Sequence, residues 1–178
     1  LYRTADAGNS WHRVLACEPE DAVQCIAIPS DYQSQHTILV GTENSGVLIS
    51  HDGGNSWQPT NNGLPSLCVN ALALSPDYRY SRLLAAATNG GIALSNDGGN
   101  SWRLVGGGTK TVMSVDLSGA ENRVILAGLF SEGILRSEDG GNSWSSANHG
   151  LAANYLIGLA LSPVFDTDSI LFAWGPSE

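Results

Sequence analysis

The sequence predicts an all-β fold built from repeats of about 45 residues, and three observations support this prediction. First, an octapeptide with the pattern Ser/Thr-x-Asp-x-Gly-Asn-Ser-Trp occurs four times, at Thr4–Trp11, Ser50–Trp57, Ser95–Trp102 and Ser137–Trp144. Second, the tryptophans of these copies lie 46, 45 and 42 residues apart. Third, 21 glycines and many short apolar runs fit short strands that are joined by tight turns.

The repeat length indicates the architecture, because a period of about 40–50 residues is the size of one four-stranded propeller blade. In the second repeat, apolar or alternating runs at 23–28, 37–42 and 47–50 predict three strands, and 56–58 predicts an outer strand. The same pieces recur from Val69, from Val112 and, incompletely, from Tyr155. We therefore expect a β-propeller with four blades' worth of strands in each chain.

The two ends of the chain predict two half-blades. The sequence begins inside a third strand (1–4) and stops just after a second strand (169–174). Joining Glu178 to Leu1 would place Trp144 and Trp11 45 residues apart, which is one full repeat. We expect the half-blades 1–15 and 154–178 to complete one blade, with full blades at about 22–60, 68–105 and 111–147. Completion within the chain would give a four-bladed monomer, and completion by a second copy would give an eight-bladed dimer.

The octapeptide lies in the hairpin between the third and fourth strands, and its residues suit a turn. Glycines supply positive φ angles, the Asp carboxylate accepts backbone N–H bonds, and the Trp packs between neighbouring blades. We assign these structural roles to Asp6, Trp11, Asp52, Trp57, Asp97, Trp102, Asp139 and Trp144.

These residues resemble the Asp-box, or BNR repeat, whose usual form is Ser/Thr-x-Asp-x-Gly-x-Thr/Ser-Trp, and the repeat covers nearly the whole chain. Similar repeats occur in sialidases, xyloglucan-cleaving glycosidases, sortilin-type receptors and photosystem II assembly factors. The resemblance implies a β-propeller and an extracellular or extracytoplasmic location. It does not specify a function.

Composition excludes several classes of partner. Seventeen acidic residues against eight basic ones give a net charge of −9, which argues against nucleic acid. No apolar run is long enough to cross a membrane. Cys17 and Cys25 either form a disulfide, or Cys25 and Cys68 are small apolar fillers. No cysteine or histidine spacing resembles a zinc site, and each motif copy has too few carboxylates for calcium, so we expect no metal or cofactor.

Two enzyme classes with similar repeats have catalytic requirements that this sequence can be compared with. Sialidase chemistry needs an arginine cluster and a Tyr–Glu pair, and the family's Arg-Ile-Pro signature is absent here. The resemblance to xyloglucanases implies two carboxylates across a cleft between two propellers. Asp116 is the one acid at a central apolar position, and we expect it to be a solvated residue facing the channel.

A non-catalytic binding or scaffold module is therefore the favoured function, with a protein or carbohydrate partner. Propellers usually bind on the face that carries the second-to-third-strand loops and the connections between blades, which we call the loop face. Our candidate contacts there are Trp174, Leu129, Phe130, Tyr155, His149 and Glu43. The alternative is a xyloglucanase-like glycosidase propeller, or a fragment of one.

Overall fold

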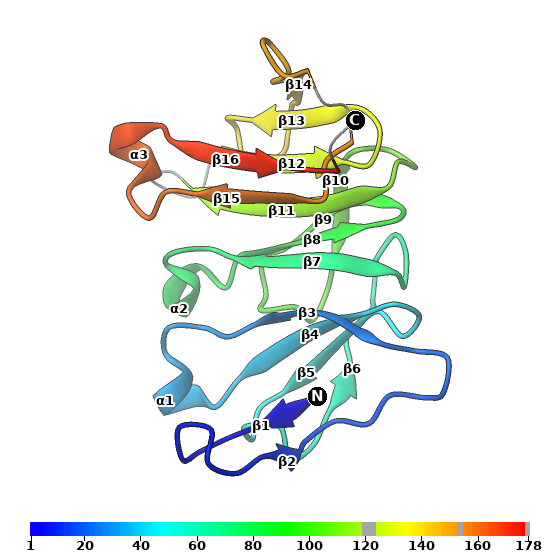
Figure 1. Ribbon diagram of the computed structural model, residues 1–178, viewed down its shortest axis with the longest axis vertical. Helices are drawn as coiled ribbons and strands as arrows, with labels where there is room; N and C mark the ends of the chain where they lie inside the picture. The colour runs from blue at the N-terminus through cyan, green and yellow to red at the C-terminus, as the bar shows by residue number, and fades with distance from the viewer. Residues whose placement is uncertain (119–123, 153–154, 177–178) are drawn as a thin grey trace.

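The computed structural model describes residues 1–118, 124–152 and 155–176, and over these residues the fold is all-β, as predicted. Three four-stranded antiparallel sheets follow one another along the chain, with a two-stranded sheet at each end (Figure 1). Residue 154 and the last two residues of the expected C-terminal half-blade lie outside the described residues.

The strands of each sheet are consecutive in sequence, so each four-stranded sheet is a simple meander and each two-stranded sheet is an antiparallel pair. The N-terminal pair is β1 (Tyr2–Arg3) and β2 (His12–Arg13). The first complete sheet contains β3 (Val23–Ala27), β4 (Ile38–Thr42), β5 (Val47–Ser50) and β6 (Gln58–Pro59). The second contains β7 (Val69–Leu74), β8 (Leu84–Thr88), β9 (Gly91–Ser95) and β10 (Arg103–Gly106). The third contains β11 (Val112–Ser118), β12 (Val124–Leu129), β13 (Gly133–Ser137) and β14 (Ser145–Ser146). The C-terminal pair is β15 (Gly158–Leu161) and β16 (Leu171–Trp174).

The core lies between the stacked sheets. Every residue of β4 and β8 is buried, because neighbouring sheets cover both faces of these second strands. Three apolar clusters fill the successive spaces between sheets, and they centre on Leu39, Ile92 and Leu126. This packing explains why the second strands read as continuous apolar runs rather than as alternating ones.

Three one-turn helices join first strands to second strands and were not predicted. They are α1 (Tyr32–Gln35), α2 (Tyr78–Ser81) and α3 (Phe165–Asp168). Each ends at a residue with positive φ, namely His36, Arg82 or Ser169. All three helices lie along the left edge of Figure 1, and the loop face is the opposite edge.

The two half-blades of the chain do not pair with each other over the described residues. β1 and β2 form one sheet, and β15 and β16 form a separate one. They lie toward opposite ends of the longest axis in Figure 1. The number of blades in a closed ring therefore stays a prediction. None of the helices that the structure describes is long and apolar enough to cross a membrane.

Candidate functional site

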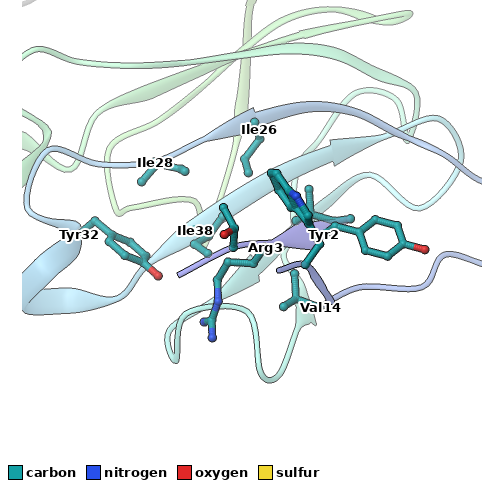
Figure 2. Close-up of a pocket in the computed structure, with 10 residues that line it drawn as sticks. Tyr2, Arg3, Val14, Ile26, Ile28, Tyr32 and Ile38 are labelled. Atoms are coloured by element: carbon teal, nitrogen blue, oxygen red, sulfur yellow. The ribbon is translucent and has the colours of Figure 1, made fainter. Parts of the chain in front are cut away.

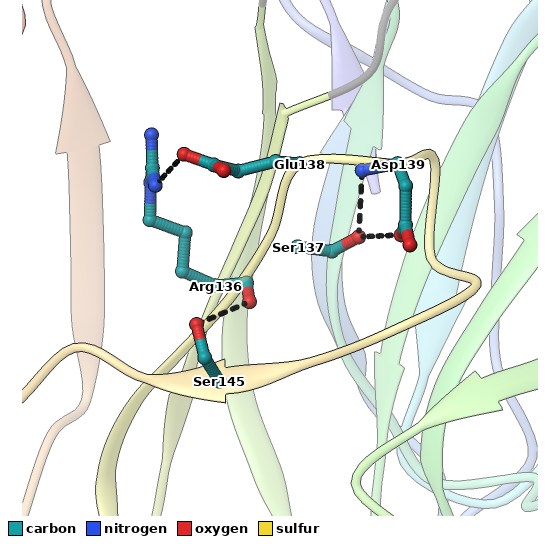
Figure 3. A network of polar contacts seen from close by, with 5 residues as sticks. All are labelled: Arg136, Ser137, Glu138, Asp139 and Ser145. Carbon is teal, nitrogen blue, oxygen red and sulfur yellow. Dashed lines mark hydrogen bonds and ion pairs between the residues drawn. The ribbon is translucent and has the colours of Figure 1, made fainter.

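The four octapeptide copies form the same hydrogen-bonded turn. In the last copy, the Ser137 hydroxyl donates to Asp139 at 2.9 Å (Figure 3). The backbone N–H and the hydroxyl of Ser143 donate to the two oxygens of the same carboxylate at 2.8 and 2.6 Å. Beside this turn, Arg136 forms an ion pair with Glu138. The motif carboxylate is thus saturated by its own hairpin, as the turn assignment predicts.

These hydrogen bonds keep the motif carboxylates ionised. Donation from the serine that precedes the tryptophan lowers the pKa of Asp6 and of Asp139 to about 2. The same donation lowers the pKa of Asp52. Burial raises the pKa of Asp97, but the hydrogen bonds from Ser101, Ser95 and Asn100 together outweigh it and the net shift is downward. A carboxylate held in this way stabilises a turn, and its oxygens are occupied by local donors.

Three of the motif tryptophans donate a hydrogen bond to the sheet that precedes their own sheet in the chain. The indole N–H of Trp102 donates to the Thr60 carbonyl at 2.8 Å, and its side chain is only 5% exposed. Trp144 donates to the Val105 carbonyl at 2.8 Å in the same way. Trp11, in the N-terminal pair of strands, is 59% exposed. Each copy that follows another sheet in the chain thus bonds to that sheet through its indole N–H.

Two of the predicted contacts meet on the loop face. The rings of Phe130 and Tyr155 pack edge to face, with centroids 5.2 Å apart and an interplanar angle of 89°. Both side chains are about half exposed, at 48% and 49%. They come from different segments, since Phe130 follows β12 and Tyr155 precedes β15. The fold thus builds one exposed aromatic pair from two connections.

The loop that carries Phe130 is held in place by several bonds. Its backbone N–H donates to the Thr111 carbonyl at 3.0 Å. Lys110, in the connection before β11, forms an ion pair with Glu132, in the loop between β12 and β13. The Asn148 side-chain amide donates to the Glu132 carbonyl at 2.8 Å. A pre-ordered loop loses little conformational entropy on binding, which favours affinity.

Other predicted contacts have different positions. Leu129 is 1% exposed, because it pairs with Val112 inside the third complete sheet, so its predicted role at the loop mouth is wrong. His149 is exposed, but it lines a cavity with Arg136 and Leu171. Glu43 follows β4 in the first complete sheet, and it is exposed near Asp21 and Cys68 rather than near the aromatic pair at the third complete sheet.

Trp174 has a different register from the predicted one. The sequence repeat predicts that the second strands end at Thr42, Thr88, Leu129 and Trp174, which would make these four positions equivalent. In the structure Trp174 pairs with Gly158, just as Gly128 pairs with Ser114 and Ala87 pairs with Ala71 in the complete sheets. Trp174 therefore occupies a strand position that is glycine or alanine in those sheets. Its indole lies over Gly158, where a Cβ would come within 1.9 Å of the ring.

A groove of about 360 Å³ runs along the first strands, and Trp174 forms one wall. Its other lining residues include Asn70, Met113, Ser114, Asp116 and Ile157. Trp174 remains 50% exposed, so its ring is available to a molecule in this groove. The groove is a second candidate site beside the aromatic pair.

Asp116 is half-buried and hydrogen-bonded, and not a freely solvated residue as expected. Its carboxylate accepts the backbone N–H of Leu117 at 2.9 Å and that of Leu161 at 3.3 Å. Burial raises the pKa of Asp116, and these two bonds oppose the rise. The bond to Leu161 joins β11 to β15, so the carboxylate has a structural role in docking the C-terminal pair of strands.

The three cysteines are free thiols. Burial raises the pKa of Cys25 to about 11, and its sulfur packs against the first apolar cluster. The apolar-filler prediction for Cys25 therefore agrees with the structure, and the disulfide alternative does not. Within the described residues, no group of three or more His, Cys, Asp or Glu side chains is placed to hold a metal ion.

No protein-family model matches this chain, and no curated protein matches it. Several solved structures do. An ancestral GH74 enzyme matches with a TM-score of 0.64 and 22% identity, over 78% of this chain and 20% of that one. YCF48 bound to D1 peptide matches with a TM-score of 0.62 and 17% identity, over 89% of this chain and 50% of that one. The computationally designed Ika4 protein matches with a TM-score of 0.64 and 12% identity, over 91% of both chains.

The GH74 and YCF48 neighbours are propellers, so the chain's β-propeller character is supported. The chain spans about a fifth to a quarter of the GH74 enzymes that it resembles. With identities of 22% or less, this likeness shows a fold and no activity.

Proposed function

We propose that this chain is a non-catalytic binding module that holds a protein segment on its loop face. The observation that carries the proposal is the exposed Phe130–Tyr155 pair on a loop fixed by hydrogen bonds and an ion pair. Exposed, rigid aromatic side chains are the usual anchors of protein interfaces. The similarity to YCF48 bound to D1 peptide is consistent with a peptide-like partner.

The negative charge of the chain indicates which charge the partner carries. The chain carries a net charge of −9, and the loop face includes Glu18, Glu20, Asp21 and Glu43. An acidic surface on the same face as an aromatic anchor favours a peptide that combines an apolar or aromatic residue with basic ones. A carbohydrate chain is the second ligand class, because Trp174 lines a groove with polar residues such as Asn70 and Asp116.

The alternative function is a glycosidase related to the GH74 enzymes. Glycoside hydrolysis needs two carboxylates on opposite sides of the scissile bond. In this chain Asp116 is held by two backbone N–H groups and docks β15, which leaves it poorly placed to act as a nucleophile or an acid. The geometry therefore supports binding better than catalysis.

A peptide-selection experiment tests the proposal. A phage-displayed random dodecapeptide library would be panned on the 178-residue chain and on a Phe130→Ala, Tyr155→Ala double variant. We expect enriched peptides to lose at least tenfold in affinity for the double variant, since each aromatic anchor contributes on the order of 1–2 kcal/mol. Tyr80→Ala is the matched control, because Tyr80 is 81% exposed in α2, on the opposite edge of the molecule.

Two results would reject the binding proposal. One is equal affinity of the native chain and the Phe130→Ala, Tyr155→Ala variant for every enriched peptide. The other is release of reducing sugar from xyloglucan by the native chain and not by Asp116→Asn, which would support the glycosidase.

A further inference from the structure

A polar pocket of about 310 Å³ lies on the edge of the molecule that carries the helices, between α1 and α2 (Figure 1). Gln35 of α1 and Tyr78 of α2 line it, and the third octapeptide copy adds Gly98 and Asn100. All of its walls come from the first two complete sheets and the connections within them. The pocket therefore involves neither of the two-stranded sheets, and it lies opposite the loop face.

Arg82 provides the positive charge of this pocket. Its guanidinium carbon lies 5.7 Å from the centre of the Tyr78 ring, and Tyr78 is only 2% exposed. The backbone of Arg82 is also fixed, because its N–H donates to the Tyr78 carbonyl at 2.9 Å and its carbonyl accepts the Gly98 N–H at 3.0 Å. Within the described residues, Arg82 forms no ion pair with a carboxylate. Its charge and its fork of N–H donors can therefore serve an external anion.

The cavity between β1 and the first complete sheet has a different character (Figure 2). Tyr32, the first residue of α1, lines it as Tyr78, the first residue of α2, lines the polar pocket. The guanidinium of Arg3 donates there to the Gly53 carbonyl at 2.5 Å, so this arginine is already bonded to the protein. The rest of that lining includes three isoleucines, at positions 26, 28 and 38. A polar lining around an unpaired arginine thus distinguishes the pocket at Arg82.

The remaining wall of the pocket offers groups that can bond to hydroxyls. Thr37 is 4% exposed, and its hydroxyl lies 3.3 Å from Nδ1 of His51. The side-chain amide of Asn100 donates to the Asp97 carbonyl at 2.7 Å, which fixes this side chain and leaves its oxygen as an acceptor. Gln35 adds an exposed amide. Amide and hydroxyl groups both donate and accept hydrogen bonds, as the hydroxyls of a ligand require.

Two acidic side chains near the pocket limit the charge of its ligand. Asp97 lines the pocket, and its carboxylate accepts the backbone N–H and the hydroxyl of Ser101 at 2.9 and 2.5 Å. Burial raises the pKa of Tyr78, and Arg82, which lowers it, has a larger effect than Asp31 or Asp97, which raise it. The local potential therefore favours one negative charge beside Arg82. Asp97 and the net charge of −9 disfavour a dianion such as phosphate.

We propose that this pocket binds a small monovalent carboxylate that carries several hydroxyl groups. The carboxylate pairs with the fork of Arg82, in the bidentate geometry that guanidinium groups favour. The hydroxyls of the ligand bond to the side chains of Gln35, Thr37 and Asn100. Because the pocket and the loop face lie on opposite edges, this site and the peptide site can each be present without the other.

Titration of the native chain with sodium gluconate, followed by NMR of the backbone and side-chain amides, tests the site. Ligand efficiencies of small molecules give a ligand of this size a dissociation constant on the order of 1 mM. We expect saturable shifts at the side-chain amides of Gln35 and Asn100 and at the Nε–H of Arg82. No saturable shift, or shifts confined to residues outside the pocket, would overturn the proposal.

Two further compounds separate the parts of the ligand that the pocket recognises. Sorbitol differs from gluconate only in having CH₂OH in place of the carboxylate, and we expect it to bind at least about tenfold more weakly. Inorganic phosphate at mildly alkaline pH is a dianion, and we expect it to bind more weakly than gluconate as well. Equal affinity for sorbitol and gluconate would refute the carboxylate contact. Tighter binding of phosphate at the same residues would refute the choice of a monovalent ligand.

Two arginine variants assign the binding to Arg82. Arg82→Gln removes the charge and the fork of donors, and we expect it to weaken gluconate binding at least about tenfold. Arg79→Gln is the matched control, because Arg79 is exposed in α2 and its guanidinium lies over Tyr80 instead of in the pocket. Equal weakening in both variants, or native affinity in Arg82→Gln, would contradict the proposal. The comparison of gluconate with sorbitol on the native chain remains decisive if Arg82→Gln does not fold.

Discussion

Each motif turn depends on one ionised carboxylate, which links the stability of the hairpins to pH. The pKa of Asp6 and Asp139 is about 2 in the folded chain, below the ordinary value of 3.8. A lowered folded pKa gives stability that is present above about pH 4 and is lost as the pH falls toward 2. We expect the urea midpoint to fall over this range. Asp139→Asn should reduce that slope, and Glu18→Gln, at an exposed site, should not. An unchanged slope for Asp139→Asn would contradict this account of the turn.

The tryptophan N–H is a second residue-scale feature that can be tested. Trp102→Phe removes the donor to the buried Thr60 carbonyl, and an unsatisfied buried acceptor costs about 1–3 kcal/mol. We expect the free energy of unfolding to fall by about that amount. Leu104→Ala, which truncates a half-exposed side chain, should have a smaller effect. Equal losses would mean that the hydrogen bond contributes little.

The docking of β15 on β11 is an element-scale feature. Asp116→Ala removes the acceptor of the Leu117 and Leu161 N–H groups. We expect faster hydrogen exchange in 158–161 and 171–174, while the β4 and β8 amides remain protected. Uniformly faster exchange would show instead that Asp116 supports the whole fold.

The strands could be predicted from sequence because their signals are local. The run 37–42 predicts β4 and the run 47–50 predicts β5, since apolar periodicity and flanking turns are visible in the sequence alone. The helices α1 to α3 lack such a signal, because they end at His36, Arg82 and Ser169 rather than at glycine. Only the observed pairing of Gly158 with Trp174 reveals the one-residue register difference at β16.

The candidate site could be predicted only in part, for a similar reason. Phe130 follows a predicted second strand and Tyr155 precedes a predicted first strand, so both could be assigned to the loop face from sequence. The contact between their rings could not be predicted. Leu129 and Phe130 are neighbouring apolar residues in sequence. The pairing of Leu129 with Val112 decides that one is buried and the other exposed. Tertiary packing, which the sequence does not display, sets that difference.

At the scale of the whole molecule, the chain has two separate kinds of surface. The two-stranded sheets at either end carry Trp11 and Phe172, which are 59% and 69% exposed. The loop face carries Phe130 and Tyr155 and is available to a partner molecule.

The most direct measurement of the central claim is hydrogen exchange on the native chain, with and without a dodecapeptide enriched in the library selection. Binding on the loop face predicts slower exchange at 107–111, 129–132 and 148–152, with the four octapeptide turns unchanged. Slower exchange at the turns around Asp52, Asp97 and Asp139, with none at 129–132, would contradict the account and place the binding surface on the opposite face.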